Sequence, residues 1–159
     1  MSPEKTLLIP KIENGFVLDH IPTGRGVKVL SLIRAHKELD EAVISVGLHY
    51  SSQRLGHKDL IKVQCSQLPQ SFLQHLSLIV PGVTIKRIEN FGVAQKLVLE
   101  PTELIDNLLT CPNPGCITNH ERDVTTCFHL VKREPMKFRC NHCERWFALP
   151  ELESRLKLI

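Results

Sequence analysis

Four cysteines in the last third of the chain are arranged as C-x4-C and C-x2-C, with 23 residues between the two pairs. Each short pair can span a tight turn, and turn-forming residues occupy 112–115 in the first pair and Asn141 in the second. Two such turns facing each other place four thiolates at the corners of a tetrahedron, as a closed structural zinc site requires, with Zn–S bonds of about 2.3 Å. The spacing therefore predicts one structural zinc ion per chain. The predicted ligands are Cys111, Cys116, Cys140 and Cys143.

Other interpretations of these cysteines explain less of the pattern. A disulfide or a set of unrelated buried thiols does not require this spacing, and a redox role for Cys140 and Cys143 leaves the first pair without a function. A zinc ion held by four protein ligands has no open position for water, so metal catalysis is not expected. The sequence also contains no recognisable Ser/His/Asp or Cys/His set. We therefore predict a chain that is not an enzyme, with Cys65 and Cys127 as small buried hydrophobic side chains.

The basic surplus of the chain lies in its first hundred residues. Residues 1–100 contain 12 Lys or Arg and 9 Asp or Glu, whereas residues 101–159 contain 8 of each. A zinc ribbon that binds nucleic acid usually carries the basic surplus itself. The balanced C-terminal part and the lack of a spaced aromatic platform therefore argue against nucleic acid as a partner. A zinc-ribbon nucleic-acid-binding protein remains the alternative, supported by the cysteine spacing and an isoelectric point of about 8.6.

No segment of the sequence has the pattern of a secretory signal or a membrane span. Residues 1–5 lead into only a short apolar run at 7–10, and no stretch approaches the roughly 18 apolar residues that cross a membrane. Cysteines without a secretory signal favour a reducing compartment. We therefore expect a cytoplasmic protein without a membrane partner.

Hydrophobic periodicity divides the first hundred residues into strands and helices. The order is strand, helix, strand, strand, helix, strand, with an extra N-terminal strand and a final hairpin. This order predicts an α+β fold, a ferredoxin-like antiparallel sheet with two helices on one face. The expected strands are residues 7–12, 16–21, 42–49, 59–65, 83–88 and 92–99, the expected helices are 24–36 and 69–80, and a polar loop is expected at 51–57.

A boundary near Pro101 separates this domain, residues 1–100, from a small mostly-β zinc-binding domain, residues 101–159. The second part has too few residues to bury a large core, so metal ligation is expected to supply much of its folding free energy. Its expected elements are a linker helix at 104–109, strands at 124–132, 136–140 and 146–149, and a tail helix at 151–159.

Several short sequence motifs, called words below, occur along the chain in addition to the spaced cysteines. They are D-H-I-P at 19–22, K-D-L-I-K at 58–62, R-I-E-N-F at 87–91, and I-D-N at 105–107, which leads into the first cysteine pair. In this order, the words resemble the regulatory chain of aspartate carbamoyltransferase over the full length of the sequence. The resemblance implies an allosteric domain that binds the nucleotides CTP and ATP, and a zinc domain that docks on a separate catalytic chain. It also implies a non-catalytic regulatory subunit of pyrimidine biosynthesis that forms regulatory-chain homodimers.

The resemblance implies a set of nucleotide-binding residues in the first domain. Lysine ammonium groups can neutralise phosphates, and a carboxylate suits a ribose hydroxyl or a base amino group. Taken singly, each lysine is more often a solvated surface charge, and G-x-G at 24–26 is more often a helix-start turn than an anion site. The implied contacts are Asp19, His20, Lys62 and Lys96, with Lys86 as a further charge, and Ile12, Val17, Leu60, Ile88 and Val93 as the pocket lining.

The resemblance also assigns contacts with the catalytic chain to the two cysteine turns. Asn113 lies in the first turn and Glu144 follows the second, and a turn fixed by metal ligation loses little entropy on docking. Lys5 is the nearest counterpart of an N-terminal phosphate-binding lysine in the family. The segment 101–110 is the only covalent path between the two domains, so we expect it to transmit the allosteric signal.

Overall fold

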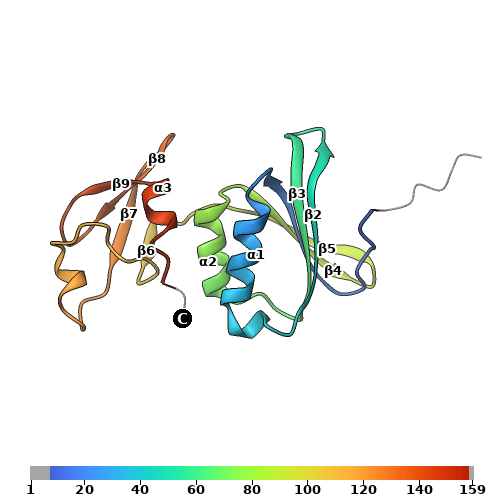
Figure 1. The fold of residues 1–159 in the computed structure, drawn as a ribbon, viewed down its shortest axis with the longest axis horizontal. Helices are drawn as coiled ribbons and strands as arrows, with labels where there is room; N and C mark the ends of the chain where they lie inside the picture. The colour runs from blue at the N-terminus through green and yellow to red at the C-terminus, as the bar shows by residue number, and fades with distance from the viewer. Residues whose placement is uncertain (1–7, 158–159) are drawn as a thin grey trace, which may run out of the picture.

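The computed structural model describes residues 8–157, which form two antiparallel sheets (Figure 1). Each sheet has its own hydrophobic core. The larger sheet has the strand order β2-β3-β1-β4-β5. Its first four strands and two helices follow the ferredoxin-like order, and β5 extends the sheet beside β4. The elements are β1 (Gly15–Pro22), α1 (Gly26–Ala35), β2 (Val43–Ser52), β3 (Gly56–Gln64), α2 (Gln70–Ile79), β4 (Val83–Glu89) and β5 (Gly92–Leu99).

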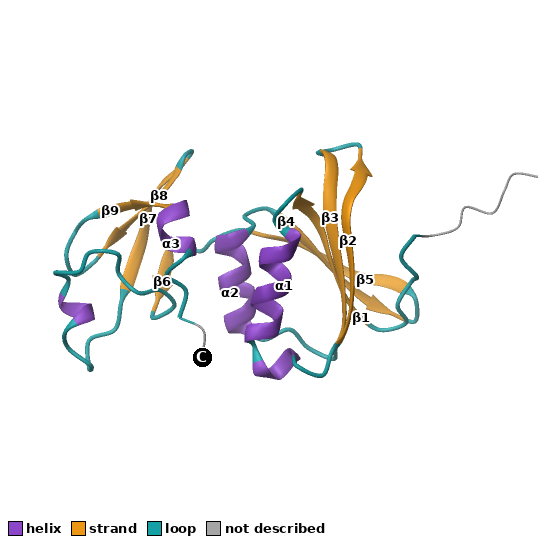
Figure 2. Ribbon diagram, viewed as in Figure 1, coloured by secondary structure: helices purple, strands orange, loops and turns teal. Residues whose placement is uncertain are grey.

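Helices α1 and α2 cover one face of this sheet and separate it from the smaller sheet (Figure 2). Alternation along the strands supplies the buried layer, because successive side chains of a strand point to opposite faces. Leu18 of β1 and Ile61 of β3 are fully buried under the helices. They pack with Ile33 of α1 and with Phe72 of α2. We call this set of contacts the first core.

The smaller sheet has the order β6-β7-β8-β9 and holds the cysteines at one end. Phenylalanine and leucine side chains fill most of its interior and pack against the cysteine side chains. We call this cluster, which contains Leu109, Phe128, Phe138, Phe147 and Leu152, the second core. The elements are β6 (Leu104–Asp106), β7 (Cys127–Arg133), β8 (Met136–Cys140), β9 (Trp146–Ala148) and α3 (Leu149–Glu153). The predicted fold class, a ferredoxin-like α+β sheet followed by a small β-rich part, is confirmed.

The two cores meet where α2 and α3 come together. Leu78 of α2 belongs to the second core although its helix covers the larger sheet. Leu156, close to the end of the described chain, packs against both cores. None of the helices within residues 8–157 is long and apolar enough to cross a membrane.

The predicted N-terminal strand at 7–12 is wrong over its described part, because residues 8–12 form no ladder. Leu7 lies outside the described residues. The segment instead lies against the face of the larger sheet that the helices leave open. Ile12 is buried there against Val17 and Ile88, and the Lys62 ammonium donates a 2.7 Å hydrogen bond to the carbonyl of Pro10. Side-chain contacts, not strand pairing, fix this segment.

The predicted linker helix at 104–109 is also wrong. Residues Leu104–Asp106 form β6, in which Ile105 pairs with Phe128 of β7. Asn107 then adopts a left-handed conformation, φ 53°, which a helix cannot contain. The apolar residues of this segment that would share one face of a helix instead reach the hydrophobic interior from an extended chain.

Two further boundaries differ from the sequence-based expectation. The predicted tail helix at 151–159 begins earlier and ends earlier, as α3, because Glu151 accepts a hydrogen bond from the Ala148 N–H at the helix start. After α3 the chain extends, and Leu156 bridges to Leu109, while residues 158 and 159 lie outside the described part. The expected loop at 51–57 narrows to a turn at 53–55, since β2 and β3 pair as far as Ser52 and Gly56.

Candidate functional sites

The four predicted cysteine ligands converge on one point at the end of the second core. Their sulfur atoms all lie within 4.8 Å of one another. Two of the Sγ–Sγ distances are 3.8 Å, between Cys111 and Cys143, and 3.9 Å, between Cys116 and Cys140. A tetrahedron with metal–sulfur bonds of about 2.3 Å has edges of about 3.8 Å. The arrangement therefore fits a single tetrahedral metal ion with four thiolate ligands.

Burial disfavours the charged thiolate form of the buried cysteines when no cation is present. It raises the pKa of the Cys111 and Cys140 thiols. Burial also acts to raise the pKa of Cys143, but the Arg145 N–H and the Asn113 side chain outweigh it and lower that pKa to about 7. A divalent cation would deprotonate all four thiols, because thiolates are the species that bind metal.

The predicted interface residues lie in the two turns that carry the cysteines. The Asn113 side-chain oxygen accepts a 3.1 Å hydrogen bond from the Gly115 N–H. The backbone carbonyl of Asn113 accepts a 2.7 Å hydrogen bond from the side-chain amide of Asn119. Glu144 is exposed, with a left-handed backbone at φ 61°. Both side chains therefore sit on turns whose backbone is fixed close to the sulfur cluster.

A second candidate site is a cavity of about 330 Å³ on the open face of the larger sheet. Eight of the ten residues predicted to bind nucleotide line it. The cavity also contains Lys11 and Phe91, which the sequence interpretation did not include. The eight are Ile12, Val17, Asp19, Leu60, Lys62, Lys86, Ile88 and Val93.

Strand register explains why these residues meet. Val17 of β1 pairs with Lys62 of β3 on one side and with Lys86 of β4 on the other. Lys86 in turn pairs with Lys96 of β5. Directly paired residues of neighbouring strands point to the same face, so the three lysines form one row across the sheet. Lys96 stands at the exposed end of this row, outside the cavity lining.

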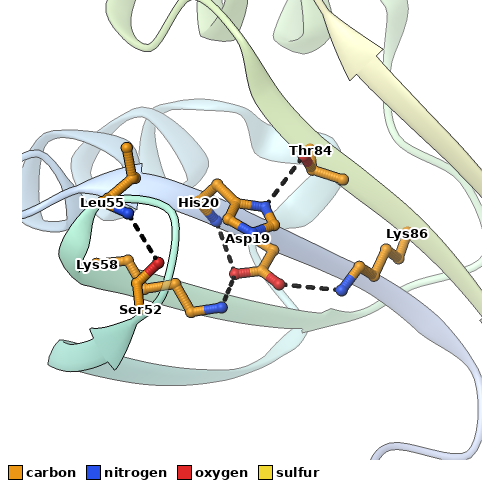
Figure 3. A network of polar contacts seen from close by, with 7 residues as sticks. All are labelled: Asp19, His20, Ser52, Leu55, Lys58, Thr84 and Lys86. Atoms are coloured by element: carbon orange, nitrogen blue, oxygen red, sulfur yellow. Dashed lines mark hydrogen bonds and ion pairs between the residues drawn. The ribbon is translucent and has the colours of Figure 1, made fainter.

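Asp19 is the polar centre of the cavity, and two lysines converge on it (Figure 3). Its carboxylate is 2.7 Å from Lys58 Nζ and 3.0 Å from Lys86 Nζ, and it accepts a 2.7 Å bond from the His20 N–H. Burial acts to raise the pKa of Asp19, but these hydrogen bonds outweigh it and lower the pKa to about 2. Asp19 is therefore a fixed negative charge at physiological pH.

His20 lies beside this cavity but does not line it. Its backbone is left-handed, φ 60°, and its Nδ1 lies 3.2 Å from the Thr84 hydroxyl (Figure 3). Burial and the neighbouring cations Lys58 and Arg54 lower the pKa of His20, although Asp19 opposes them. The imidazole is therefore neutral near pH 7 and can donate or accept a hydrogen bond at the rim.

Two residues of the K-D-L-I-K word have contacts that the sequence interpretation missed. Lys58 pairs with Asp19, and Asp59, which is 1% exposed, accepts hydrogen bonds from three backbone N–H groups. The alternation of Asp59 with Ile61 and Val63, which are both buried, was the available signal that this carboxylate lies inside.

Comparisons with known proteins identify the family of the chain. The model described as "Aspartate carbamoyltransferase regulatory chain, allosteric domain" matches residues 7–100, and the one described as "metal binding domain" of the same chain matches residues 103–153. The chain belongs to the family of aspartate carbamoyltransferase regulatory chains. The matched allosteric segment contains the cavity, and the matched metal-binding segment contains all four cysteines.

Regulatory chains of aspartate carbamoyltransferase from distant organisms align with nearly the whole sequence. The one from Pyrococcus abyssi is 36% identical over 150 residues, which span 94% of this chain and 98% of the relative. The one from Thermoplasma acidophilum is 37% identical over 142 residues, 89% of this chain and 93% of the relative. The one from Vibrio campbellii is 37% identical over 148 residues, 93% and 95% respectively. The predicted resemblance is thus confirmed, and it assigns this regulatory chain to pyrimidine biosynthesis.

Proposed function

We propose that this chain is a non-catalytic regulatory subunit that binds nucleotide effectors and controls a separate catalytic chain of aspartate carbamoyltransferase. In this proposal, residues 1–100 sense the nucleotide and residues 101–159 bind zinc and dock on the partner. The observation that carries it is one cavity in which apolar side chains, a row of lysines and a fixed carboxylate meet. Each of these features matches one part of a nucleoside triphosphate.

The effectors that we propose are CTP and ATP. A base would pack on the apolar lining around Val17 and Ile88, and the phosphates would be neutralised by Lys62, Lys86 and Lys11. Asp19 accepts hydrogen bonds only, so it suits a ribose hydroxyl or a base amino group and repels phosphate. His20 and Lys96, next to the cavity, would reach the more exposed end of the ligand.

Effector control requires that the nucleotide bind two states of the assembly with different affinity. The resulting coupling is reciprocal, so a catalytic chain held in one state by its substrate would change nucleotide affinity by the same factor. We further propose that regulatory chains pair as homodimers, and that Asn113 and Glu144 contact the catalytic chain from their metal-fixed turns. The zinc ion holds these turns in place and supplies no chemistry of its own.

Calorimetry on the zinc-loaded regulatory chain tests the nucleotide site. Replacing Lys62 by Ala should weaken CTP and ATP binding at least about tenfold, because a charge-assisted hydrogen bond contributes roughly 1.5–3 kcal/mol. Lys132→Ala removes an exposed lysine of β7, far from the cavity, and should leave both affinities unchanged. Equal affinities for wild type and Lys62→Ala would remove Lys62 from the site.

Reconstitution with the catalytic chain tests the regulatory role. Nucleotide should shift the aspartate saturation curve of the complex and leave the curve of the isolated catalytic chain unchanged. Asn113→Ala and Glu144→Ala should weaken assembly, whereas Asp123→Ala, an exposed change in the same part of the chain, should not. Turnover by the regulatory chain alone would contradict the proposal. Tight, steeply salt-dependent binding of DNA or RNA would favour the zinc-ribbon alternative.

A further inference from the structure

A buried carboxylate fixes the start of helix α1 to the middle of the larger sheet. Asp59 Oδ2 accepts hydrogen bonds from the N–H groups of Gly24, at 3.0 Å, and Gly26, at 2.9 Å. Its Oδ1 accepts a 2.9 Å bond from the His49 N–H. A Cβ atom at Gly26 would stand only 2.8 Å from Asp59 Oδ2, so the loop is pressed directly onto the carboxylate. Any displacement of this part of β3 therefore moves the loop at 24–26.

The same loop reaches the metal-binding part of the chain through Arg25. Its guanidinium lies 2.8 Å from Glu153 Oε2, at the end of α3, and Lys28 Nζ lies 3.5 Å from the same oxygen. The Glu153 side chain is only 12% exposed, so this ion pair is better shielded than most pairs at a surface. Helix α3 in turn packs on β8 and β9 beside the cysteines. Arg25 thus joins a loop of the first part to an element of the second.

Neighbouring residues of β3 connect this loop to the cavity on the opposite face. Lys58 and Asp59 are consecutive, so their side chains point to opposite faces of the sheet. Lys58 pairs with Asp19 on the open face (Figure 3), with 2.7 Å between Nζ and Oδ1, while Asp59 holds the start of α1 on the helical face. Hydrogen bonds, ion pairs and the backbone of β3 therefore connect Asp19, through the loop at 24–26, to Glu153.

We propose that the Arg25–Glu153 ion pair transmits occupancy of the cavity to the metal-binding part, beside the covalent segment 101–110. This inference rests on the proposed function, since it names the internal contact by which that function operates. An anionic ligand competes with Asp19 for the Lys86 ammonium, which lines the same cavity. Lys58 is then the cation that remains paired with Asp19, beside the His20 N–H, and the change in that pair acts through Asp59 on the loop that carries Arg25.

Reconstituted holoenzyme containing Arg25→Gln or Glu153→Gln tests the proposal. We expect each variant regulatory chain to bind CTP with wild-type affinity and to retain its metal. The nucleotide-induced shift in the aspartate saturation curve should shrink by about 1.4- to 5-fold, the range for a partly exposed ion pair. Arg34→Gln in helix α1, where the Arg34 guanidinium donates a hydrogen bond to the Asp40 carbonyl, should keep the full shift.

A charge-reversed pair separates the contact from nonspecific damage. Arg25→Glu and Glu153→Arg should each reduce the shift, and the double variant should recover part of it, giving a non-additive cycle. Hydrogen exchange of the isolated regulatory chain gives a readout apart from activity. Added CTP should change exchange in residues 149–153 of the wild type and change it less in Arg25→Gln, and an equal change in both would contradict the role of the ion pair.

Each possible result bears on a different claim. A full nucleotide shift in both Gln variants, or an additive cycle, overturns the role of the ion pair. Loss of CTP binding in Arg25→Gln also overturns it, because Arg25 would then act on the cavity itself. Failure of wild-type chain to bind CTP or to shift the curve would overturn the proposed function, and this inference with it.

Discussion

The charge of Asp19 leads to a prediction about both the stability of the protein and its selectivity for ligands. Replacing Asp19 by Asn preserves the shape of the side chain but removes the negative charge that Lys58 and Lys86 approach at 2.7 and 3.0 Å. The pKa of Asp19 is about 2, compared with an ordinary value of 3.8. Each pKa unit corresponds to about 1.36 kcal/mol, so the folded state gains roughly 2 kcal/mol from the ionised carboxylate.

The sign of this contribution follows from the lowered pKa. Asp19 stabilises the folded state fully above about pH 4, and the contribution is lost as pH falls through the folded pKa near 2. Acid also protonates the cysteine thiolates and releases metal, so an acid titration would mix two effects. Guanidinium unfolding at pH 7 with zinc present avoids this difficulty. Asp19→Asn should lower the free energy of unfolding by roughly 2 kcal/mol.

A matched control and a second readout make the prediction stricter. Asp40→Asn removes an exposed carboxylate and should change stability by less than about 0.5 kcal/mol. Without Asp19, both lysines are available to an anion, so inorganic triphosphate should bind more tightly, while ATP should lose the hydroxyl or amino contact that the proposed function assigns to Asp19. An Asp19→Asn variant as stable as wild type, with unchanged triphosphate affinity, would refute the electrostatic account.

Three further perturbations test other parts of the structure. Cys140→Ser should lose the bound metal, which we propose to be one zinc ion measurable by metal analysis, and unfold the C-terminal part, whereas retained metal in a native-like fold would contradict the four-ligand site. Leu109→Ala should cost about 2–5 kcal/mol in chemical unfolding, because Leu109 is fully buried in the second core; a cost below about 1 kcal/mol would show that the core collapses around the gap. Burial lowers the pKa of His36 and of His75, and the neighbouring His36 lowers the pKa of His75 further. The stability that these two buried, neutral imidazoles provide is therefore complete above pH 6.5 and is lost as the pH falls below it. His75→Gln should therefore make the free energy of unfolding less pH-dependent between pH 5.5 and 7.5 than in the exposed-site control His57→Gln, and an unchanged slope would exclude the pair as its source.

The parts of the fold that follow simple periodicity could be predicted from the sequence. Strand β8, at Met136–Cys140, was predicted with its observed bounds, because alternation and the second cysteine pair mark both ends. The cysteine cluster was predictable for a similar reason, since its chemistry depends on residue type and spacing alone. The segment at 104–109 was not, because its apolar residues suit both one face of a helix and an extended chain. Pairing of Ile105 with Phe128, a contact between distant residues, decides between them.

The contacts of Asp59, next to Lys58 in β3, depend on irregular backbone that no alternation reveals. His20 and His49 both have positive φ, 60° and 62°, and the strand register shifts at each of them. These two bulges surround Asp59 and allow its carboxylate to meet three backbone N–H groups. Lys11 was missed because it belongs to a segment expected to pair as a strand, whereas that segment is fixed by side chains from β1, β3 and β4.

The placement of Leu78 and Leu156 has a consequence for how the chain unfolds. Leu78 belongs to helix α2 but is buried in the second core, and Leu156 touches both cores. A protein divided near residue 100 would therefore present an apolar patch on each fragment, and the fragments would tend to self-associate. For the intact chain, the shared side chains make melting cooperative, because neither half can open without exposing leucine surface of the other. Chelation of the metal should accordingly lower the melting temperature of the allosteric half, which contains none of the metal ligands.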